Sequence, residues 1–213
     1  MVTYQAPDES STWYRHFLFL GLLTAFVNLL QAVSGISLGF RADSPLLLVF
    51  GLDAIVGGFR EVLIATRIGR FGTADVEVGT DGLASRVLAV AYIVVGVLAF
   101  AGGASVLAGG RAPAPSFLGL GLAAISMLLI PIIGSYMKSL AMEVRSPALK
   151  DAAVFTFANS YLSMVLLIGL LVNGGMRYWW GDPVATLIMC PFIVQKGIQI
   201  LVGNRDMEFS EGE

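Results

Sequence analysis

Residues 44–68 read SPLLLVFGLDAIVGGFREVLIATRI, a long apolar run that three charged side chains interrupt before a fourth, Arg67, near its end. A bilayer crossing needs about 20 mostly apolar residues, and this run is long enough. It opens with a Ser-Pro pair, which is favoured at the N-cap and the first position of a helix. The run therefore predicts a membrane-spanning helix in which Asp53, Arg60 and Glu61 require an explanation.

The composition of the whole chain points to a membrane protein. Of its 213 residues, 56% are apolar and only 13% are charged, and the mean hydropathy is +0.80. Soluble domains usually carry about 25% charged residues. The net charge of −2 does not indicate a nucleic-acid partner. With one cysteine and one histidine, His16, a Cys/His zinc cluster is excluded, and a Ser-His-Asp triad would depend on that single histidine.

Six apolar segments predict an all-α, polytopic protein, a bundle of six transmembrane helices in the lipid bilayer. Backbone polar groups in lipid must be satisfied internally, so long continuous runs of this kind are helices. The connections between them are rich in glycine, proline and charge. We expect one membrane domain over residues 14–203, with short cytoplasmic tails over 1–13 and 204–213. The segments are 14–36, 45–68, 84–108, 116–137, 151–174 and 183–203.

The distribution of lysine and arginine predicts the orientation of the bundle. If the six segments cross the membrane in alternating directions, three basic residues lie on the far side. Nine lie on the N-terminal side: Arg15, Arg67, Arg70, Arg86, Lys138, Arg145, Lys150, Lys196 and Arg205. Basic residues concentrate on the cytoplasmic side. Both termini are therefore expected in the cytoplasm, and the expected location is the cell (plasma) membrane.

Charged residues inside the second segment are candidates for an ion pathway. Asp53, Gly57 and Glu61 follow one another at helical spacing and share one stripe of the helix. Ionisable residues within a bilayer are functional candidates by default. The alternative is structural, because Asp53 can instead bond a polar neighbour such as Asn28 or Gln31 between helices. Arg60 is expected to snorkel toward water or to pair.

The fifth segment carries a second polar cluster. Its residues AAVFTFANSYLS, at 152–163, include Asn159 and Ser160 in an apolar helix. A Ser-Pro pair precedes this segment as it does the second, and counting from each serine places Asp53 and Asn159 in related slots, one turn apart. Related halves with matching sites are common in transporters. Interhelical hydrogen bonding is again the alternative. The predicted ion pathway comprises Asp53, Glu61, Asn159 and Ser160.

Small residues recur along the third segment. Ala99 and Gly103, and likewise Ala101 and Ser105, are four residues apart. Such spacing permits close approach of two helices. The stripe predicts packing within the chain or a homodimer that forms through transmembrane helices.

Three segments resemble the transmembrane domain of the cation diffusion facilitator (cation efflux) family. The second, SPLLLVFGLDAIVGGFREVLIATRI, resembles the family's acid-bearing second helix. The stretch from SPALKDAAVF through GLLVNGGMRYWWGDP to the last helix is closer still. The likeness extends over residues 14–203, is most specific in the last third, and is to a short branch without the cytoplasmic domain.

The resemblance implies a metal site of four ligands. The family has two acids one turn apart on its second helix and a His and an Asp one turn apart on its fifth. These positions fall on Asp53, Gly57, Phe155 and Asn159 in this sequence. Only Asp53 and Asn159 retain ligand atoms, a set that suits a hard, partly hydrated cation better than zinc. No resident cofactor is expected, and the divalent cation would be a substrate.

The sequence therefore predicts a divalent metal cation transporter of the zinc-type efflux class, coupled to protons, with an altered site. In this reading Asp53 also carries the proton. The alternative is a transport-inactive structural or regulatory membrane partner derived from such a transporter. An enzyme is not expected, since no nucleophile and base pair is visible in the sequence.

Overall fold

The computed structural model describes residues 9–71, 82–144 and 147–210, and this part of the chain is helical throughout, joined by short connections. A short π-helix, Leu171–Gly175, continues the fifth α-helix. The all-α prediction is confirmed for the described residues. The α-helices are α1 (Glu9–Ala42), α2 (Pro45–Phe71), α3 (Gly82–Ala108), α4 (Phe117–Val144), α5 (Pro147–Leu170) and α6 (Gly181–Ser210).

Five of these helices are long and apolar enough to cross a membrane: α1, α3, α4, the combined α5 and π-helix, and α6. Large apolar side chains cover the outside of the bundle, including Phe26, Phe100 and Leu128, each more than half exposed. Such a surface suits contact with lipid. Helix α2 has a comparable length of 27 residues, but its charged residues keep it outside this group. The count of six spans stays a prediction.

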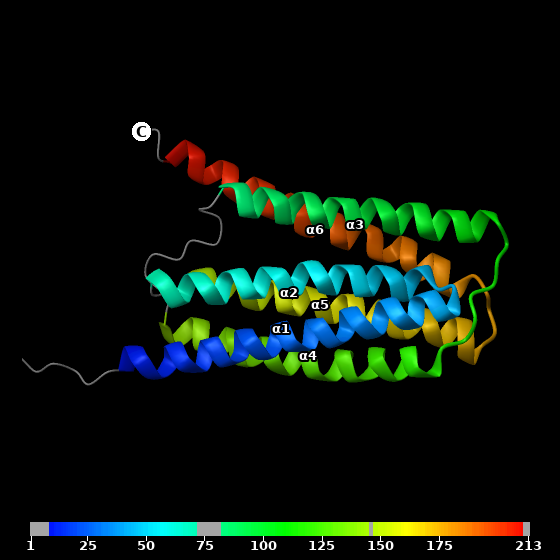
Figure 1. The fold of residues 1–213 in the computed structure, drawn as a ribbon, viewed down its shortest axis with the longest axis horizontal. Coiled ribbons are helices and arrows are strands. Elements are labelled where there is room, and N and C mark those ends of the chain that lie inside the picture. The colour runs from blue at the N-terminus through cyan, green and yellow to red at the C-terminus, as the bar shows by residue number, and fades with distance from the viewer. Residues whose placement is uncertain (1–8, 72–81, 145–146, 211–213) are drawn as a thin grey trace, which may run out of the picture.

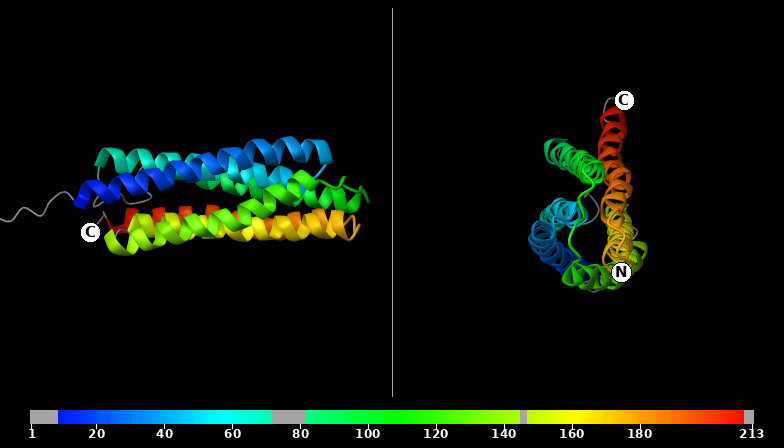
Figure 2. Two further views of the ribbon diagram at one scale, coloured as in Figure 1. Left: turned by 90° about the horizontal axis from the view of Figure 1, so that it is seen from below. Right: turned by 90° about the vertical axis from the view of Figure 1, so that its right-hand side faces the viewer.

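The helices run side by side along one axis in two groups, as Figure 1 and Figure 2 show. Helices α1, α2, α4 and α5 form the larger group. Helix α6 starts beside α5 and crosses to lie along α3, so that it links the two groups. The first turns of α1 and the last turns of α6 lie at the same end of the bundle. This agrees with termini on one side of the membrane; that this side is cytoplasmic stays a prediction.

The helix boundaries extend beyond the apolar segments. Helix α1 begins at Glu9, five residues before the predicted span, and α6 continues to Ser210. The predicted connection over 37–44 is mostly helix, because α1 continues to Ala42. There Asp43 adopts φ of 49°, and the Ser44 amide bonds back to the Gly39 carbonyl over 3.0 Å. This is a Schellman-type end, which turns the chain within two residues.

A buried contact at the start of α2 joins this helix to α6. The Ser44 side chain accepts a hydrogen bond from the Leu47 amide over 3.1 Å, so it caps α2 as its sequence predicts. Its hydroxyl also donates to the Asp182 carboxylate, which accepts a second bond from the Leu46 amide over 3.2 Å. The first turns of α2 and α6 are thereby held together.

The small residues of α3 pack against α6 within the same chain. Ala99 is fully buried, and a methyl group on Gly103 would lie 3.0 Å from the Pro183 carbonyl oxygen of α6. At Gly96 the same methyl would lie 2.4 Å from the Val194 side chain. The predicted close approach is therefore intramolecular for this half of the stripe. Ala101 and Ser105 are exposed, and the homodimer stays a prediction.

Candidate ion site

Three side chains from three helices meet in the middle of the bundle. The Lys196 ammonium of α6 donates to both carboxylate oxygens of Asp53 on α2, over 3.0 and 2.9 Å. It also donates to the amide oxygen of Asn159 on α5, over 2.6 Å. Asp53 and Lys196 are only 4% and 3% exposed. A buried cationic nitrogen is thus held by three protein oxygens.

Helix geometry explains how these residues meet. Asp53 lies eight residues after the first residue of α2, or about 12 Å along the axis. Lys196 lies fifteen residues after the start of α6, about 22 Å from the same end of the bundle. Side chains of a helix point back toward its N-terminus. The long lysine stem therefore reaches back along α6 toward the level of Asp53.

Gly57 and Asn28 extend this site toward α1. A Cβ atom on Gly57 would lie 3.6 Å from both the Asn159 amide nitrogen and the Asn28 amide oxygen. Gly57 therefore faces polar groups of α1 and α5, and a side chain can begin there at ordinary contact distance. The Asn28 amide nitrogen is buried and has no hydrogen-bond partner among the described residues. On the opposite side, the Tyr92 ring of α3 lies 5.4 Å from the Lys196 nitrogen.

A second buried ion pair lies two turns further along α2. The Arg60 guanidinium donates to its neighbour Glu61 over 3.3 Å, and both side chains are buried. The guanidinium carbon lies 3.8 Å from the centre of the Phe155 ring on α5. Such a cation over an aromatic face is stabilised electrostatically. Phe155, which offers no metal ligand, thus supports an internal cation.

The predicted site residues separate into two sets. Asp53 and Asn159 are brought together, since both bind the same nitrogen. Glu61 pairs with Arg60, and both are buried instead of reaching water at the bundle end. The hydroxyl oxygen of Ser160 is buried without a hydrogen-bond partner in the described part of the chain. On α2, Asp53, Arg60 and Glu61 are all buried, whereas Asn159 and Ser160 belong to α5.

Other polar residues of the bundle make the structural hydrogen bonds that were the alternative to an ion pathway. Gln31, considered as a partner for Asp53, donates to Ser126 of α4 over 2.8 Å. The Ser163 hydroxyl donates to the backbone carbonyl of Asn159 over 3.0 Å, as in ordinary helices. Asp53 is instead paired with the Lys196 ammonium, not with Asn28 or Gln31, the two partners considered from the sequence.

The orientation count placed Lys196 wrongly among residues that flank the membrane. It is buried and paired with Asp53 inside the bundle. The signal that could have found it is in the sequence: Lys196 is the only charged residue between Pro183 and Gly203. A lone charge within an apolar segment is an intramembrane residue that needs a partner. The unpaired acid of α2 is the matching signal.

The donor set does not resemble a conventional metal centre. Within residues 9–71, 82–144 and 147–210, no three His, Cys, Asp or Glu side chains cluster as metal ligands do. Asp53 contributes one carboxylate, while Asn28 and Asn159 contribute neutral amides. These oxygens suit hard cations more than zinc. In the structure the lysine nitrogen lies where the Asp53 and Asn159 oxygens converge.

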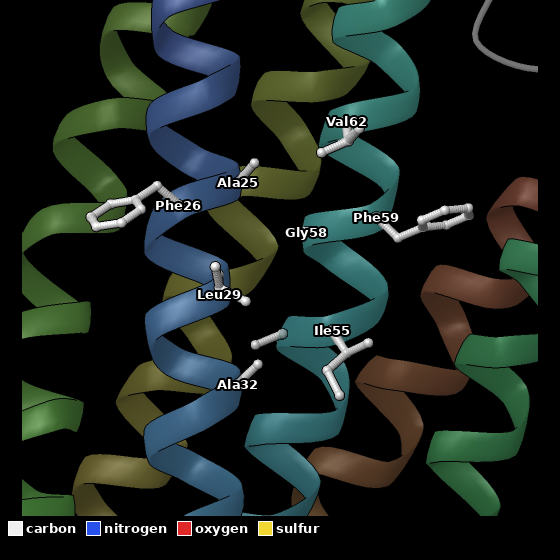
Figure 3. A pocket seen from close by; sticks show the side chains of 9 residues that line it. Ala25, Phe26, Leu29, Ala32, Ile55, Gly58, Phe59 and Val62 are labelled. Carbon is white, nitrogen blue, oxygen red and sulfur yellow. The ribbon is translucent and has the colours of Figure 1, made fainter.

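A separate groove between α1 and α2 is apolar and opens away from the ion site. Figure 3 shows its lining, which includes Phe26, Leu29 and Phe59 and contains no polar side chain. Its volume is about 390 Å³. Ile55 and Phe59 lie on the exposed face of α2, whereas Asp53 lies on the buried face. The groove therefore contributes nothing to binding an ion at Asp53.

The length and apolar surface of the helices define a multi-pass integral membrane protein. In an alignment of 175 positions that covers 79% of this chain, the sequence is 29% identical to an uncharacterized transporter, YdbO, of Bacillus subtilis (strain 168). The chain spans 60% of the length of that relative. No protein-family model matches the chain.

Proposed function

We propose that this protein is a secondary transporter of inorganic cations, of the cation efflux type, with its substrate site at Asp53 and Asn159. One observation carries the proposal: oxygens from α2 and α5 converge on a single buried cationic nitrogen. Transporter sites commonly lie near the middle of the membrane between related helices. The similarity to a protein named as a transporter supports the same function class.

The resemblance to cation efflux proteins implies a divalent metal as substrate and a proton as counter-ion. The donor set is thin for such an ion, because Gly57 and Phe155 supply no ligand. Proton coupling fits the site well, since a ligand must be deprotonated before a cation can bind it. The assay below therefore includes divalent metals together with monovalent ions.

A second candidate function is a transport-inactive membrane partner. It is favoured by the lysine nitrogen, which occupies the position of a bound cation. If this ammonium never leaves, the site is permanently filled and no ion can be carried. The two candidates differ in one measurable quantity, cation flux.

The decisive experiment reconstitutes the purified chain in proteoliposomes with an internal pH dye. Zinc, manganese, iron, cobalt, sodium and potassium are each supplied against a pH gradient. We expect proton-linked uptake of at least one ion and loss of that uptake in Asp53→Asn. Full activity in this variant would place the site elsewhere, and no flux of any ion in the wild type would favour the inactive partner.

Asp43→Asn is the matched control for this substitution. Asp43 is exposed in the turn after α1, and its φ of 49° suits asparagine as well as aspartate. The same chemical change at this position should leave flux unchanged. Equal loss in both variants would indicate a general effect on the protein instead of a role for Asp53 in the site.

Gly57→Asp tests whether the site can be converted toward divalent ions. A Cβ atom at this position would meet its nearest neighbours, Asn28 and Asn159, at 3.6 Å, which is ordinary contact. The variant would carry two acids one turn apart, the pattern that the family resemblance implies. We expect competition by manganese or zinc to strengthen about tenfold or more, because ligand charge largely sets the affinity for hard divalent cations. An unchanged competition profile would argue against a substrate site beside Gly57.

A further inference from the structure

We propose that one end of the bundle holds a binding site for a single anionic phospholipid, in which Arg177 binds the lipid phosphate. The site is a pocket of about 410 Å³ between the α3–α4 connection, residues 109–116, and the α5–α6 connection, residues 176–180. Both connections lie at the end of the bundle opposite the first turns of α1 (Figure 1). The pocket shares no residue with the candidate ion site.

The end of α5 forms one wall of this pocket. The π-helix Leu171–Gly175 follows α5 directly, and its residues Asn173 and Gly174 line the pocket. The buried Asn173 side chain donates to the Pro113 carbonyl of the α3–α4 connection over 3.2 Å. This bond fixes the two connections to each other around the pocket. Single π-helical turns in α-helical proteins often occur at functional sites.

The charge of the pocket favours an anion. Arg177 is the only ionic group among the described residues that line it. Its side chain is exposed and forms no ion pair or hydrogen bond within residues 9–71, 82–144 and 147–210. Its backbone adopts φ of 58°, which is uncommon for a residue other than glycine and is often associated with function. An unpaired guanidinium presents a planar set of donors that matches a phosphate.

The pocket lies at the level where two candidate membrane spans end. Phe117 is the first residue of the span Phe117–Glu143, and Gly174 is the last but one of the span Ala152–Gly175. These spans of 27 and 24 residues are about 40 and 36 Å long. The hydrocarbon core of a bilayer is only about 30 Å thick, so the ends of such helices reach the headgroup layer. Lipid phosphates lie in that layer.

Aromatic side chains mark the same level. Phe117 and Trp179 line the pocket and are 80% and 38% exposed. Tyr178 and Trp180 stack on each other beside them, with ring centroids 5.7 Å apart. Tryptophan and tyrosine are enriched at the boundary between lipid and water. The guanidinium is therefore surrounded by side chains that are typical of the membrane interface.

Helix α4 offers a path for an acyl chain from the pocket into the bilayer. Gly121, Ile125 and Leu128 follow Phe117 at helical spacing, so they share one face of α4. Ile125 and Leu128 are 63% and 70% exposed, and a Cβ atom on Gly121 would meet no atom within 4 Å. The phosphate and the acyl chain of one lipid can thus be accommodated together, whereas a free phosphate would use Arg177 alone.

The same charge argument selects the type of headgroup. Zwitterionic lipids carry an ammonium group, and no acidic side chain is among the described residues that line the pocket. Arg41 and Arg111 lie at the same end of the bundle and add positive charge. A lipid with net negative charge, such as one with a glycerol headgroup, therefore fits better than one with a choline headgroup.

Lipid titration followed by native mass spectrometry tests the proposal. The detergent-purified chain is titrated with dioleoylphosphatidylglycerol or with dioleoylphosphatidylcholine, and the complex with one bound lipid is quantified. We expect one site that binds phosphatidylglycerol at least about tenfold more tightly, because a phosphate paired with arginine and no opposing ammonium is favoured. Equal binding of the two lipids would overturn the proposal. Competition by glycerol 1-phosphate or inorganic phosphate would also overturn it, since the site would then bind a free anion.

Arg177→Gln tests the role of the guanidinium. We expect at least about tenfold weaker binding of phosphatidylglycerol, because the charged donor of the phosphate is lost. Arg41→Gln is the matched control, since Arg41 is also exposed at this end but does not line the pocket. An equal loss in both variants would indicate general attraction to a basic surface and would refute a specific site.

A second pair of variants changes the volume of the pocket without changing charge. A Cβ atom on Gly174 would lie 3.5 Å from Pro115, which is ordinary contact, so the leucine of Gly174→Leu should fill the pocket and weaken lipid binding about tenfold. Gly175→Leu is the control, because a Cβ there meets no atom within 4 Å and Gly175 does not line the pocket. Unchanged binding in Gly174→Leu would place the lipid elsewhere.

The charge pair and the volume pair are independent, so either one tests the site if a variant of the other fails to fold. None of these measurements depends on cation flux. The lipid site and the proposed transport function can therefore fail separately.

Discussion

The two buried ion pairs of α2 differ in what they connect. Asp53 is paired with Lys196 of another helix, and every oxygen of its carboxylate accepts a hydrogen bond. Glu61 is paired with Arg60, its neighbour in sequence, through one longer contact of 3.3 Å. Neither the second Glu61 oxygen nor the second Arg60 amino nitrogen has a hydrogen-bond partner among the described residues.

This difference separates a tertiary contact from a local one. Loss of the Asp53 pair removes a contact between α6 and α2, whereas loss of the Glu61 pair breaks a contact within α2 alone. Movement of α6 relative to α2 would therefore change the first pair, whereas it would leave the second pair in place. Both pairs are buried, so burial does not distinguish them. What distinguishes them is whether the two partners lie on different helices or on the same helix.

The largest effect is expected when only one partner of the Asp53 pair is removed. Lys196→Ala should lower the free energy of unfolding by about 3–5 kcal/mol, because a buried carboxylate is left without its cation. Combining Asp53→Asn with Lys196→Ala should recover part of that loss, since both charges are gone. Thermal unfolding in detergent measures the double-mutant cycle, and strictly additive effects would show that the two residues do not interact.

A smaller effect is expected for the local pair. Glu61→Gln should lower the free energy of unfolding by about 1–3 kcal/mol, because Arg60 retains the Phe155 ring and the amide retains one acceptor. The same detergent unfolding assay applies. A loss as large as that of Lys196→Ala would contradict the distinction drawn between the two pairs.

The contact between Ser44 and Asp182 sharpens the comparison, since it joins the same two helices as the Asp53 pair but without a cation. Ser44→Ala should cost about 2 kcal/mol, because it removes both the cap of α2 and the hydroxyl that faces Asp182. Cation uptake in proteoliposomes should not change. A change in this uptake would show that this end of α2 also belongs to the substrate site.

The smallest effect is expected at Phe155. Phe155→Leu should cost about 1 kcal/mol, since the side chain keeps its apolar bulk and loses only the ring beneath Arg60. Phe157→Leu is the comparison variant. Phe157 also lies on α5, and among the described residues no cation lies over its ring. If both changes cost the same, the aromatic ring of Phe155 contributes only packing.

Much of this fold follows from patterns in the sequence. Apolar runs and their polar breaks place all six helices, because lipid allows few other structures for such segments. Their ends are less predictable: the turn after α1 depends on the left-handed conformation of Asp43 and on the backbone bond from the Ser44 amide to the Gly39 carbonyl. Those features have no periodic signature in the residues around them.

Only part of the candidate site could be predicted from the sequence in the same way. Asp53 and Asn159 were selected because polar residues within apolar helices require partners. Lys196 was missed because the rule for orientation treats every lysine near a helix end as a flanking charge. The small residues of α3 show another limit, since their spacing predicts a close contact without naming the partner, which turned out to be α6.

The late position of α6 in the chain has a consequence for biosynthesis. Asp53 is made long before Lys196, its cation, and an unpaired acid in a bilayer costs at least ~2.5 kcal/mol. A two-residue turn joins α1 to α2, and both helices precede α6 by more than 100 residues in the chain. If α2 enters the bilayer before α6 is made, Asp53 lacks its cation, and a chain that stops before α6 would keep an unmatched acid there.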